Sequence, residues 1–370
     1  MKFIQVSHVN LGLSAPKDWD VPFDLKEERS EDFYNILKTC REQSVDVLFI
    51  TGNLFAAPPT RAELEALDER FLELEDTRVF WLTGTKDAPY DPLVASAFQW
   101  KSRTTVFSGD SVQRIYVARL NAEITGVGYS PVTWHKVNLE SLTRGKKGAM
   151  QVLVLPFIGE NEASEFAGND KPSLPFDYIG FGQDRMVKGD SLPHAFSAGA
   201  LSPRDFDGQP RHGYFEGILD IDEEKQVSLR MKFIQSVKHD LITLRVKATE
   251  DMAYDAVEEE VRRLISENGP ENIYEIVLTG ETSPSLFFMK EKLSELGYVV
   301  RITDETNREN LTKKLDQSDA GEAIKRFAEA LPEDEDSELR KKAMIYGFNA
   351  ILYHEDRTGK EGAGDDYSGT

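Results

Sequence analysis

The sequence predicts an α/β protein in which mixed β-sheets are flanked by helices. Three observations lead to this fold class. Strand and helix signals alternate at the start of the chain, and strand-rich sequence follows up to about residue 230. A second, shorter alternation of strand and helix begins near residue 240. Alternation of this kind is typical of parallel strands covered by helices, and a later run of strands adds antiparallel pairs to the same sheets.

Individual elements are expected from local patterns in the first 236 residues. Apolar runs predict a strand at Phe3, Ile4 and Val6 and further strands at 46–52, 79–84, 115–120, 122–128, 150–157 and 176–182. Ser30 is expected to cap a helix whose apolar stripe is Phe33, Ile36, Leu37 and Cys40, which makes Cys40 a core residue. The sequence T-R-A-E at 60–63 forms a capping box that opens a second helix, with Leu64, Leu67, Phe71 and Leu74 on one face.

The rest of the chain predicts a compact α/β unit and two short helices. The unit contains strands at 241–246, 274–280 and 298–303 and helices at 249–269 and from about 283 to 297, the first closed by Gly269-Pro270. The two helices carry apolar residues at 324, 327, 328 and 331 and at 339, 343, 346, 347 and 350. We therefore expect four regions: 1–236, 237–312, 313–354, and an acidic disordered tail at 355–370.

Composition indicates a cytoplasmic protein. The 370 residues carry a net charge of −21, which argues against non-specific coating of nucleic acid but leaves room for a local basic patch. A single cysteine, Cys40, excludes a disulfide framework and favours a reducing compartment. We expect no signal peptide and no membrane span, because no apolar run approaches the length of about 20 residues that a span requires.

Polar side chains gather where four of the predicted strands end. These positions are His8 with Asn10, Asn53, Thr85-Lys86-Asp87, and Gln183-Asp184-Arg185. Ligands of α/β proteins collect at the carboxyl ends of strands. The sequence therefore predicts one site built from these loops.

Six segments carry a resemblance to a known family. They are MKFIQVSHVNLG, DVLFITGNLF, VFWLTGTKD, ITGVGY, DYIGFGQDR and AGALSPRDFD…HGY. In this order they resemble the landmarks of the calcineurin-like metallophosphoesterases, and more narrowly the SbcD subunit of the DNA repair exonucleases. The resemblance covers residues 1 to about 230 and extends loosely over the next domain. It implies a four-layer sandwich of two mixed sheets with flanking helices, a small α/β capping domain and C-terminal helices.

The resemblance also places the family's metal ligands on this chain, and there the residue types differ. The seven family positions fall on His8, Asn10, Asn53, Thr85, Pro156, Gln183 and Arg185, and none carries the family residue. Asn53 replaces the carboxylate that bridges two cations, and Lys86 replaces the catalytic histidine. We therefore expect no catalytic residue, no metal and no cofactor, although Asp87, Asp91 and Asp184 leave room for a single weakly held Mn²⁺ or Mg²⁺.

Two interpretations of the altered loops stay open. In the first, the loops relaxed once catalysis was no longer needed, so that Lys86 pairs with nearby acids and Arg185 with Asp184 or a surface carboxylate. In the second, cationic side chains took the place of the metals and bind a phosphate without hydrolysis. The candidate residues for such a phosphate site are His8, Lys86, Arg185, Arg204 and Arg211.

Two classes of function follow from the resemblance. The first is a non-catalytic SbcD-like subunit that binds or senses DNA ends and docks an SbcC-like coiled-coil ATPase through residues 321–353; family members also form homodimers. The alternative is an active Mn- or Mg-dependent exonuclease or phosphoesterase with a remodelled site. Metal content and turnover would discriminate between the two.

Overall fold

The structure is a computed structural model that describes most of the chain. The described residues are 1–87, 98–107, 109, 111–130, 142–156, 174–188, 194–202, 204–206, 211–222, 224, 226–249, 254–280, 290–306, 322, 323, 326, 327 and 330. The chain divides into two compact units, Met1–Ile242 and Thr243–Thr370. We expected a boundary after residue 236, and the division falls slightly later, inside a strand.

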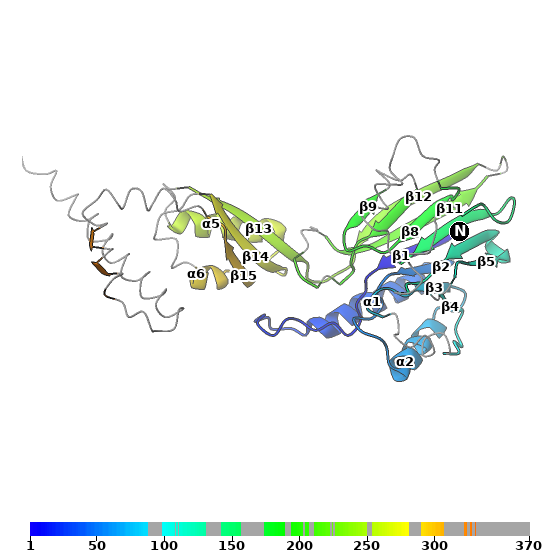
Figure 1. The fold of residues 1–370 in the computed structure, drawn as a ribbon, viewed down its shortest axis with the longest axis horizontal. Coiled ribbons are helices and arrows are strands. Elements are labelled where there is room, and N and C mark those ends of the chain that lie inside the picture. Colours follow the sequence, from blue (N-terminus) through cyan, green and yellow to red (C-terminus); the bar gives the residue numbers. More distant parts are fainter. Residues whose placement is uncertain are drawn as a thin grey trace, which may run out of the picture. The chain divides into compact units, whose positions relative to one another are not determined.

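The first unit contains two mixed sheets of six strands each (Figure 1). The first sheet has the spatial order β12 (Val227–Gln235), β11 (Gly213–Ile221), β1 (Lys2–Ser7), β2 (Val47–Thr51), β3 (Arg78–Leu82) and β4 (Thr104–Phe107). Strands β1 to β4 are parallel, and β11 and β12 add antiparallel pairs at one edge. The predicted fold class, α/β with mixed sheets, is confirmed at this level.

The second sheet repeats this mixture of directions. Its order is β5 (Gln113–Val117), β6 (Ala122–Gly126), β7 (Met150–Leu155), β8 (Tyr178–Phe181), β10 (Ala195–Ala198) and β9 (Met186–Lys188). Strands β6, β7, β8 and β10 are parallel, and β5 and β9 are antiparallel edge strands. A short 3₁₀ helix, Ala118–Leu120, joins β5 to β6.

Three apolar clusters show how the layers of this unit pack. Phe3, Phe49 and Phe80 of the first sheet meet Val152 and Tyr178 of the second in one cluster between the sheets. The other face of the first sheet packs on α1 (Leu25–Glu42) and α2 (Arg61–Leu72), and a third cluster covers the outer face of the second sheet. Every residue of β2 and β7 is buried, because both faces of a central strand are covered. Among the described residues, no helix of the expected fourth layer lies on the second sheet.

The helices of this layer agree with the predicted pattern at two points and differ from it at one. Thr60 forms the predicted capping box with Glu63, and Cys40 is fully buried, as expected. Helix α1, however, is not capped by Ser30. Asp24 is its N-cap, accepting hydrogen bonds from the backbone N–H groups of residues 26 and 27, and the Ser30 hydroxyl donates to the Lys26 carbonyl inside the helix. The helix therefore begins earlier, because Leu25 extends its buried face.

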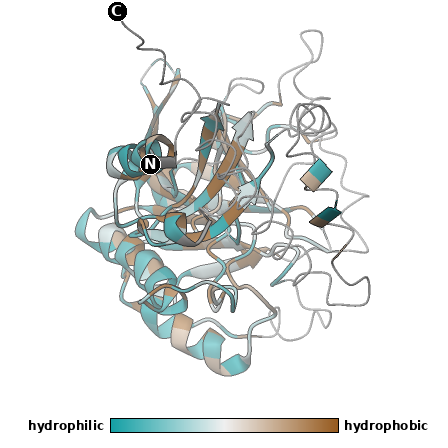
Figure 2. Ribbon diagram, turned by 90° about the vertical axis from the view of Figure 1, so that its left-hand side faces the viewer, coloured by the Kyte–Doolittle hydropathy of each residue, from teal (hydrophilic) through white to brown (hydrophobic). Residues whose placement is uncertain are grey.

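Some strands were not predicted from the sequence. β4, β9 and β10 contain four residues or fewer, which is too short for a periodic pattern. The edge strand β12 alternates apolar and polar residues over 227–233, and this pattern was missed in the sequence. In Figure 2 many of the strands have the hydrophobic colour, whereas much of the helical ribbon has the hydrophilic colour.

The second unit is a three-stranded sheet with helices. The sheet has the order β13 (Leu241–Ala248), β14 (Ile273–Gly280) and β15 (Tyr298–Asp304), and the helices are α5 (Tyr254–Asn268) and α6 (Lys290–Ser294). Helix α5 ends at Gly269, whose φ of 104° lies in the left-handed region that glycine tolerates. This position agrees with the predicted end of the helix.

The C-terminal expectations fall largely outside the described residues. Five residues between 322 and 330 are helical, with an ion pair between Glu322 and Arg326. The second expected helix, the acidic tail and most of the 321–353 segment lie outside the described residues. Within the part of the chain that the structure describes, no helix combines the length and apolar character needed to cross a bilayer.

Candidate functional site

A cleft of about 280 Å³ lies at the carboxyl ends of strands from both six-stranded sheets. The loops that follow β1, β2, β3, β7 and β8 all contribute to it. Its lining consists of His8, Asn10, Asn53, Gly84, Thr85, Lys86, Pro156, Gln183, Asp184 and Arg204. Loops far apart in the sequence meet here because parallel strands end at the same edge of a sheet.

The loop after β1 has an unusual backbone. His8 and Asn10 have φ angles of 44° and 54°, in the left-handed region that residues other than glycine seldom occupy. Asn10 holds this turn by donating from its amide to the carbonyls of His8 and Ser202, at 2.9 and 2.8 Å. The strain is maintained by surrounding contacts, as is common at functional sites.

The His8 ring has a fixed position and tautomer. It lies against Gly52, where a Cβ atom would be 2.2 Å from the ring, so only glycine fits beneath it. Its Nδ1 lies 2.8 Å from Oδ1 of Asp184, and because a carboxylate only accepts, Nδ1 is the donor. The Nε2 atom is then the remaining polar atom of the ring.

Asp184 is ionised in this arrangement. The hydrogen bond from His8 lowers the pKa of Asp184, and the charges of His8 and Arg204 add to this effect, while partial burial opposes it. The negative charge of Asp184 therefore orients the imidazole and also lies within the field of Arg204.

Asn53 and Lys86 come from neighbouring loops and are joined through the backbone. The Asn53 side-chain oxygen accepts a hydrogen bond of 2.8 Å from the Lys86 N–H. A Cβ atom on Gly84 would lie 2.4 Å from this oxygen, so glycine is required for the close approach. The Lys86 side chain is exposed and forms no ion pair with a residue that the structure describes.

Asp87 supports these loops from below. It is fully buried, and its two oxygens accept hydrogen bonds from the backbone N–H groups of Gly84, Leu54 and Phe55 at 2.6, 2.6 and 3.3 Å. Burial raises the pKa of Asp87 to about 6, against the lowering effect of these three hydrogen bonds and of His8. Asp87 therefore ties the loop after β2 to the loop after β3.

A second buried network joins the two sheets beneath the cleft. The Gln5 amide donates to the carbonyls of Phe181 and Phe196 at 3.1 and 3.0 Å, and its oxygen accepts from the Tyr178 hydroxyl. Ser7 and Thr51 share a hydrogen bond of 2.7 Å between their hydroxyls. These contacts link β1 and β2 to β8 and β10, so the cleft has a rigid floor.

The structure brings together most of the positions singled out in the sequence. Six of the seven family ligand positions line the cleft, namely His8, Asn10, Asn53, Thr85, Pro156 and Gln183. Lys86 and Arg204 line it as well. Arg185 and Arg211 are exposed and are not among the described residues that line it. Asp91 lies outside the described residues.

The two interpretations of the loops differ in their ion pairs. The first pairs Arg185 with Asp184 or a surface carboxylate, and the described partner of Asp184 is His8. It also pairs Lys86 with nearby acids, and Lys86 forms no ion pair with a residue that the structure describes. Asp184 was marked as a candidate by its position, three residues after the end of β8. Its contact with His8, which is 176 residues away in the sequence, depends on how the two sheets pack.

The other histidines lie elsewhere. His212 is fully buried and contacts Asp240 at 2.7 Å between Nδ1 and Oδ1, so its role is structural. His239 lies near Glu28 and stacks on Phe23, and His194 is exposed. His135 and His354 lie outside the described residues.

No protein-family model matches the chain, and no curated protein matches it. Among the described residues, no group of three or more His, Cys, Asp or Glu side chains is placed to hold a metal ion.

Proposed function

We propose that this chain is an SbcD-like protein of the calcineurin-like metallophosphoesterase superfamily that binds the phosphate of a DNA end without cutting it. The observation that carries the proposal is the cleft, where six positions matching the family's metal ligands meet at the ends of strands from two mixed sheets. The four-layer sandwich of that family and the capping role of the second unit belong to the same proposal.

The donor set of the cleft argues against the family's two-metal chemistry. Two neighbouring cations need a bridging carboxylate, and Asn53 offers a neutral amide whose oxygen already accepts from the Lys86 N–H. The Asn10 amide is directed at two carbonyls, and Pro156 has no ligating side chain. The residues present therefore do not fit a two-metal centre, and hydrolysis by that route is not part of the proposal.

The cationic side chains of the cleft suit a phosphate. Lys86 and Arg204 both line it, and Asp184 is the single carboxylate among the described residues that do so. The His8 Nε2 atom is a donor to phosphate only in the protonated ring, since in the neutral ring the proton is on Nδ1, which faces Asp184. Ammonium and guanidinium groups form strong, charge-assisted hydrogen bonds to phosphate oxygens.

Binding to short DNA duplexes tests the phosphate site. We expect duplexes with a 5′-phosphate to bind more tightly than the same duplexes without it, and Lys86→Gln and Arg204→Gln each to reduce that preference at least fivefold. Lys232→Gln and Arg230→Gln, both exposed on β12, are matched controls for lost positive charge. Equal affinity for the two duplexes, or equal losses in the control variants, would overturn the proposal.

An activity assay tests the alternative of a remodelled Mn- or Mg-dependent enzyme. Asp184 and His8 favour this alternative, because together they could contact one cation. The protein is assayed with Mn²⁺ on DNA and on bis-p-nitrophenyl phosphate, and its metal content is measured. Stoichiometric metal together with turnover that Asn53→Ala abolishes would replace our proposal with an active enzyme.

The proposed partner is an SbcC-like ATPase with a long coiled coil. Its docking element is the segment 321–353, of which residues 322, 323, 326, 327 and 330 are described and helical. Co-expression with such an ATPase tests the pairing. Removing residues 321–370 should abolish co-purification, whereas removing residues 355–370 should leave it intact. Retention of the ATPase by the shorter chain would exclude this docking element.

A further inference from the structure

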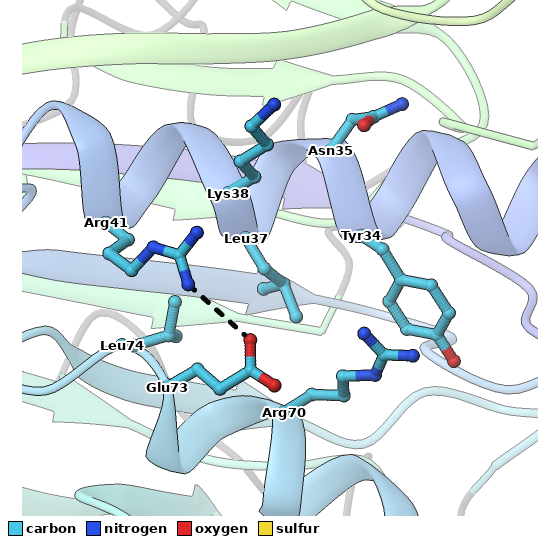
Figure 3. Close-up of a pocket in the computed structure, with 8 residues that line it drawn as sticks. All are labelled: Tyr34, Asn35, Leu37, Lys38, Arg41, Arg70, Glu73 and Leu74. Atoms are coloured by element: carbon cyan, nitrogen blue, oxygen red, sulfur yellow. Dashed lines mark ion pairs between the residues drawn. The ribbon is translucent and has the colours of Figure 1, made fainter.

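A second cavity lies on the first unit, in a groove between α1 and α2 (Figure 3). Its volume is about 250 Å³, and it shares no lining residue with the cleft at the strand ends. One wall comes from α1, with Tyr34, Asn35, Leu37, Lys38 and Arg41. The other comes from the end of α2 and the turn that follows it, with Arg70, Glu73 and Leu74.

The groove is positively charged in a strongly acidic protein. Lys38, Arg41 and Arg70 line the groove together with Glu73, and Glu42 beside the groove lies 3.8 Å from Lys38, so three positive and two negative charges leave an excess of one. The whole chain has a net charge of −21. A local excess of positive charge in such a chain attracts a small anion to this place and not to the surrounding surface.

Arg70 is held in place with its donors available. Its guanidinium carbon lies 4.6 Å from the centre of the Tyr34 ring, which is the geometry of a cation–π contact. It forms no ion pair with a residue that the structure describes. Figure 3 shows the Arg70 guanidinium between the Tyr34 ring and Glu73. Because the ring fixes the plane of the group, the N–H edges need little reordering to bind a ligand.

Arg41 on the opposite wall is only partly engaged. Its nearest approach to Glu73 is 3.7 Å, longer than the 2.7–2.9 Å of a charge-assisted hydrogen bond. Both side chains are about half exposed, at 50% and 57%. An incoming anion can therefore bond to Arg41 without breaking a short ion pair.

The floor of the groove is apolar and its size is small. Leu37 and Leu74, which are 5% and 3% exposed, line the groove together with the charged groups. An apolar floor strengthens charge interactions above it by lowering the local dielectric. The volume is below the range of about 300–1,000 Å³ that is typical of sites for larger ligands.

We propose that this groove binds the dianionic phosphate group of a small phosphate monoester. Arg41 and Arg70 lie on opposite walls and can each donate two N–H groups to the phosphate oxygens, and Lys38 provides a third cation at the rim. A dianion gains more than a monoanion here, because each of the two guanidinium groups can pair with a negatively charged oxygen. Tyr34 and Asn35 offer neutral polar groups to the rest of the ligand.

Calorimetric titration of the full chain tests this site, with Lys86→Gln and Arg204→Gln introduced to remove the cationic groups of the cleft. The probes are inorganic phosphate, glycerol 3-phosphate and the monoanion methyl sulfate. We expect the two phosphates to bind and methyl sulfate to bind at least tenfold more weakly. Arg70→Gln and Arg41→Gln should each weaken phosphate binding at least tenfold. Arg61→Gln, which removes an exposed arginine of α2 outside the groove, should change it less than twofold.

The outcomes separate this site from the cleft. Signals of the Tyr34 ring in NMR spectra should move with phosphate in the parent and stay unchanged in Arg70→Gln, and circular dichroism checks that each variant is folded. Equal affinity in Arg70→Gln and Arg61→Gln, equal affinity for methyl sulfate and phosphate, or no binding of phosphate would each overturn the proposal. None of these results depends on whether the cleft binds DNA.

Discussion

The lining of the cleft and the layer beneath it differ in how strongly the fold depends on them. The layer beneath, with Asp87, Gly52, Gln5 and Thr51, is buried and makes several hydrogen bonds or close contacts per residue. In the lining, Lys86, Asp184 and Arg204 are exposed. These three side chains can therefore be exchanged at little cost to stability, whereas the buried layer that shapes their loops cannot.

The largest effect that this comparison predicts is that of Asp87→Ala. The substitution leaves three buried backbone N–H groups without their acceptor, and each such group costs about 1–3 kcal/mol. We expect the free energy of unfolding to fall by about 4 kcal/mol, measured by urea denaturation. A loss below 1 kcal/mol would mean that the loops find other acceptors, and the contrast between the two layers would be lost.

The next effect is a pH dependence that arises from Asp87. Because its folded pKa is raised to about 6, the folded protein binds more protons than the unfolded chain between about pH 4 and 6. The contribution of Asp87 to stability is therefore present below pH 4 and is lost as the pH rises to 6, by about 3 kcal/mol. Subtracting the pH curve of Asp87→Asn from that of the parent should reveal this slope, with Asp220→Asn as the exposed control. A flat difference curve would show that Asp87 is ionised throughout.

Gly52→Ala should have a smaller effect of about 2 kcal/mol. The φ angle of Gly52 is 84°, and an added Cβ would meet the His8 ring at 2.2 Å. Gly12→Ala is a matched control, since its φ is 86° but nothing lies within 4 Å of the added atom. Thermal unfolding of both variants should show the larger loss for Gly52→Ala, and equal losses would exclude the steric role assigned to His8.

Lys86→Gln should have the smallest effect on stability. Its side chain is exposed and forms no ion pair with a described residue, so we expect the free energy of unfolding to change by less than about 0.5 kcal/mol. The same variant should lose the preference for a 5′-phosphate. A large loss of stability would place Lys86 in the supporting layer instead of the lining.

Much of this architecture was predictable because its causes are local. The capping box at Thr60, the helix end at Gly269 and the buried position of Cys40 each follow from a few neighbouring residues. The start of α1 was predicted wrongly at Ser30 because Asp24 and Ser30 are both good caps. The burial of Leu25 decides between them, and a local pattern does not contain that contact.

The candidate site could be predicted in part. Strand ends marked His8, Asn53, Lys86 and Gln183 as neighbours, because parallel strands deliver their loops to one edge. The sequence did not distinguish Arg204, which lines the cleft, from Arg185 and Arg211, which do not. These three residues lie in connecting loops. The direction of a loop side chain depends on tertiary packing, because a loop lacks the regular repeat that sets the direction of side chains in a strand or helix.

The sequence by itself determined the α/β fold class, the capping box at Thr60, the helix end at Gly269 and the gathering of polar side chains at the strand ends. Only the tertiary structure decided that His8 pairs with Asp184, that Asp87 joins two loops through three hydrogen bonds, and that Arg41 and Arg70 face each other across a groove. The physical reason is the range of the interactions. Backbone preferences and apolar periodicity act over a few residues, whereas these contacts join segments separated by up to 176 residues and exist only after the sheets and helices have packed.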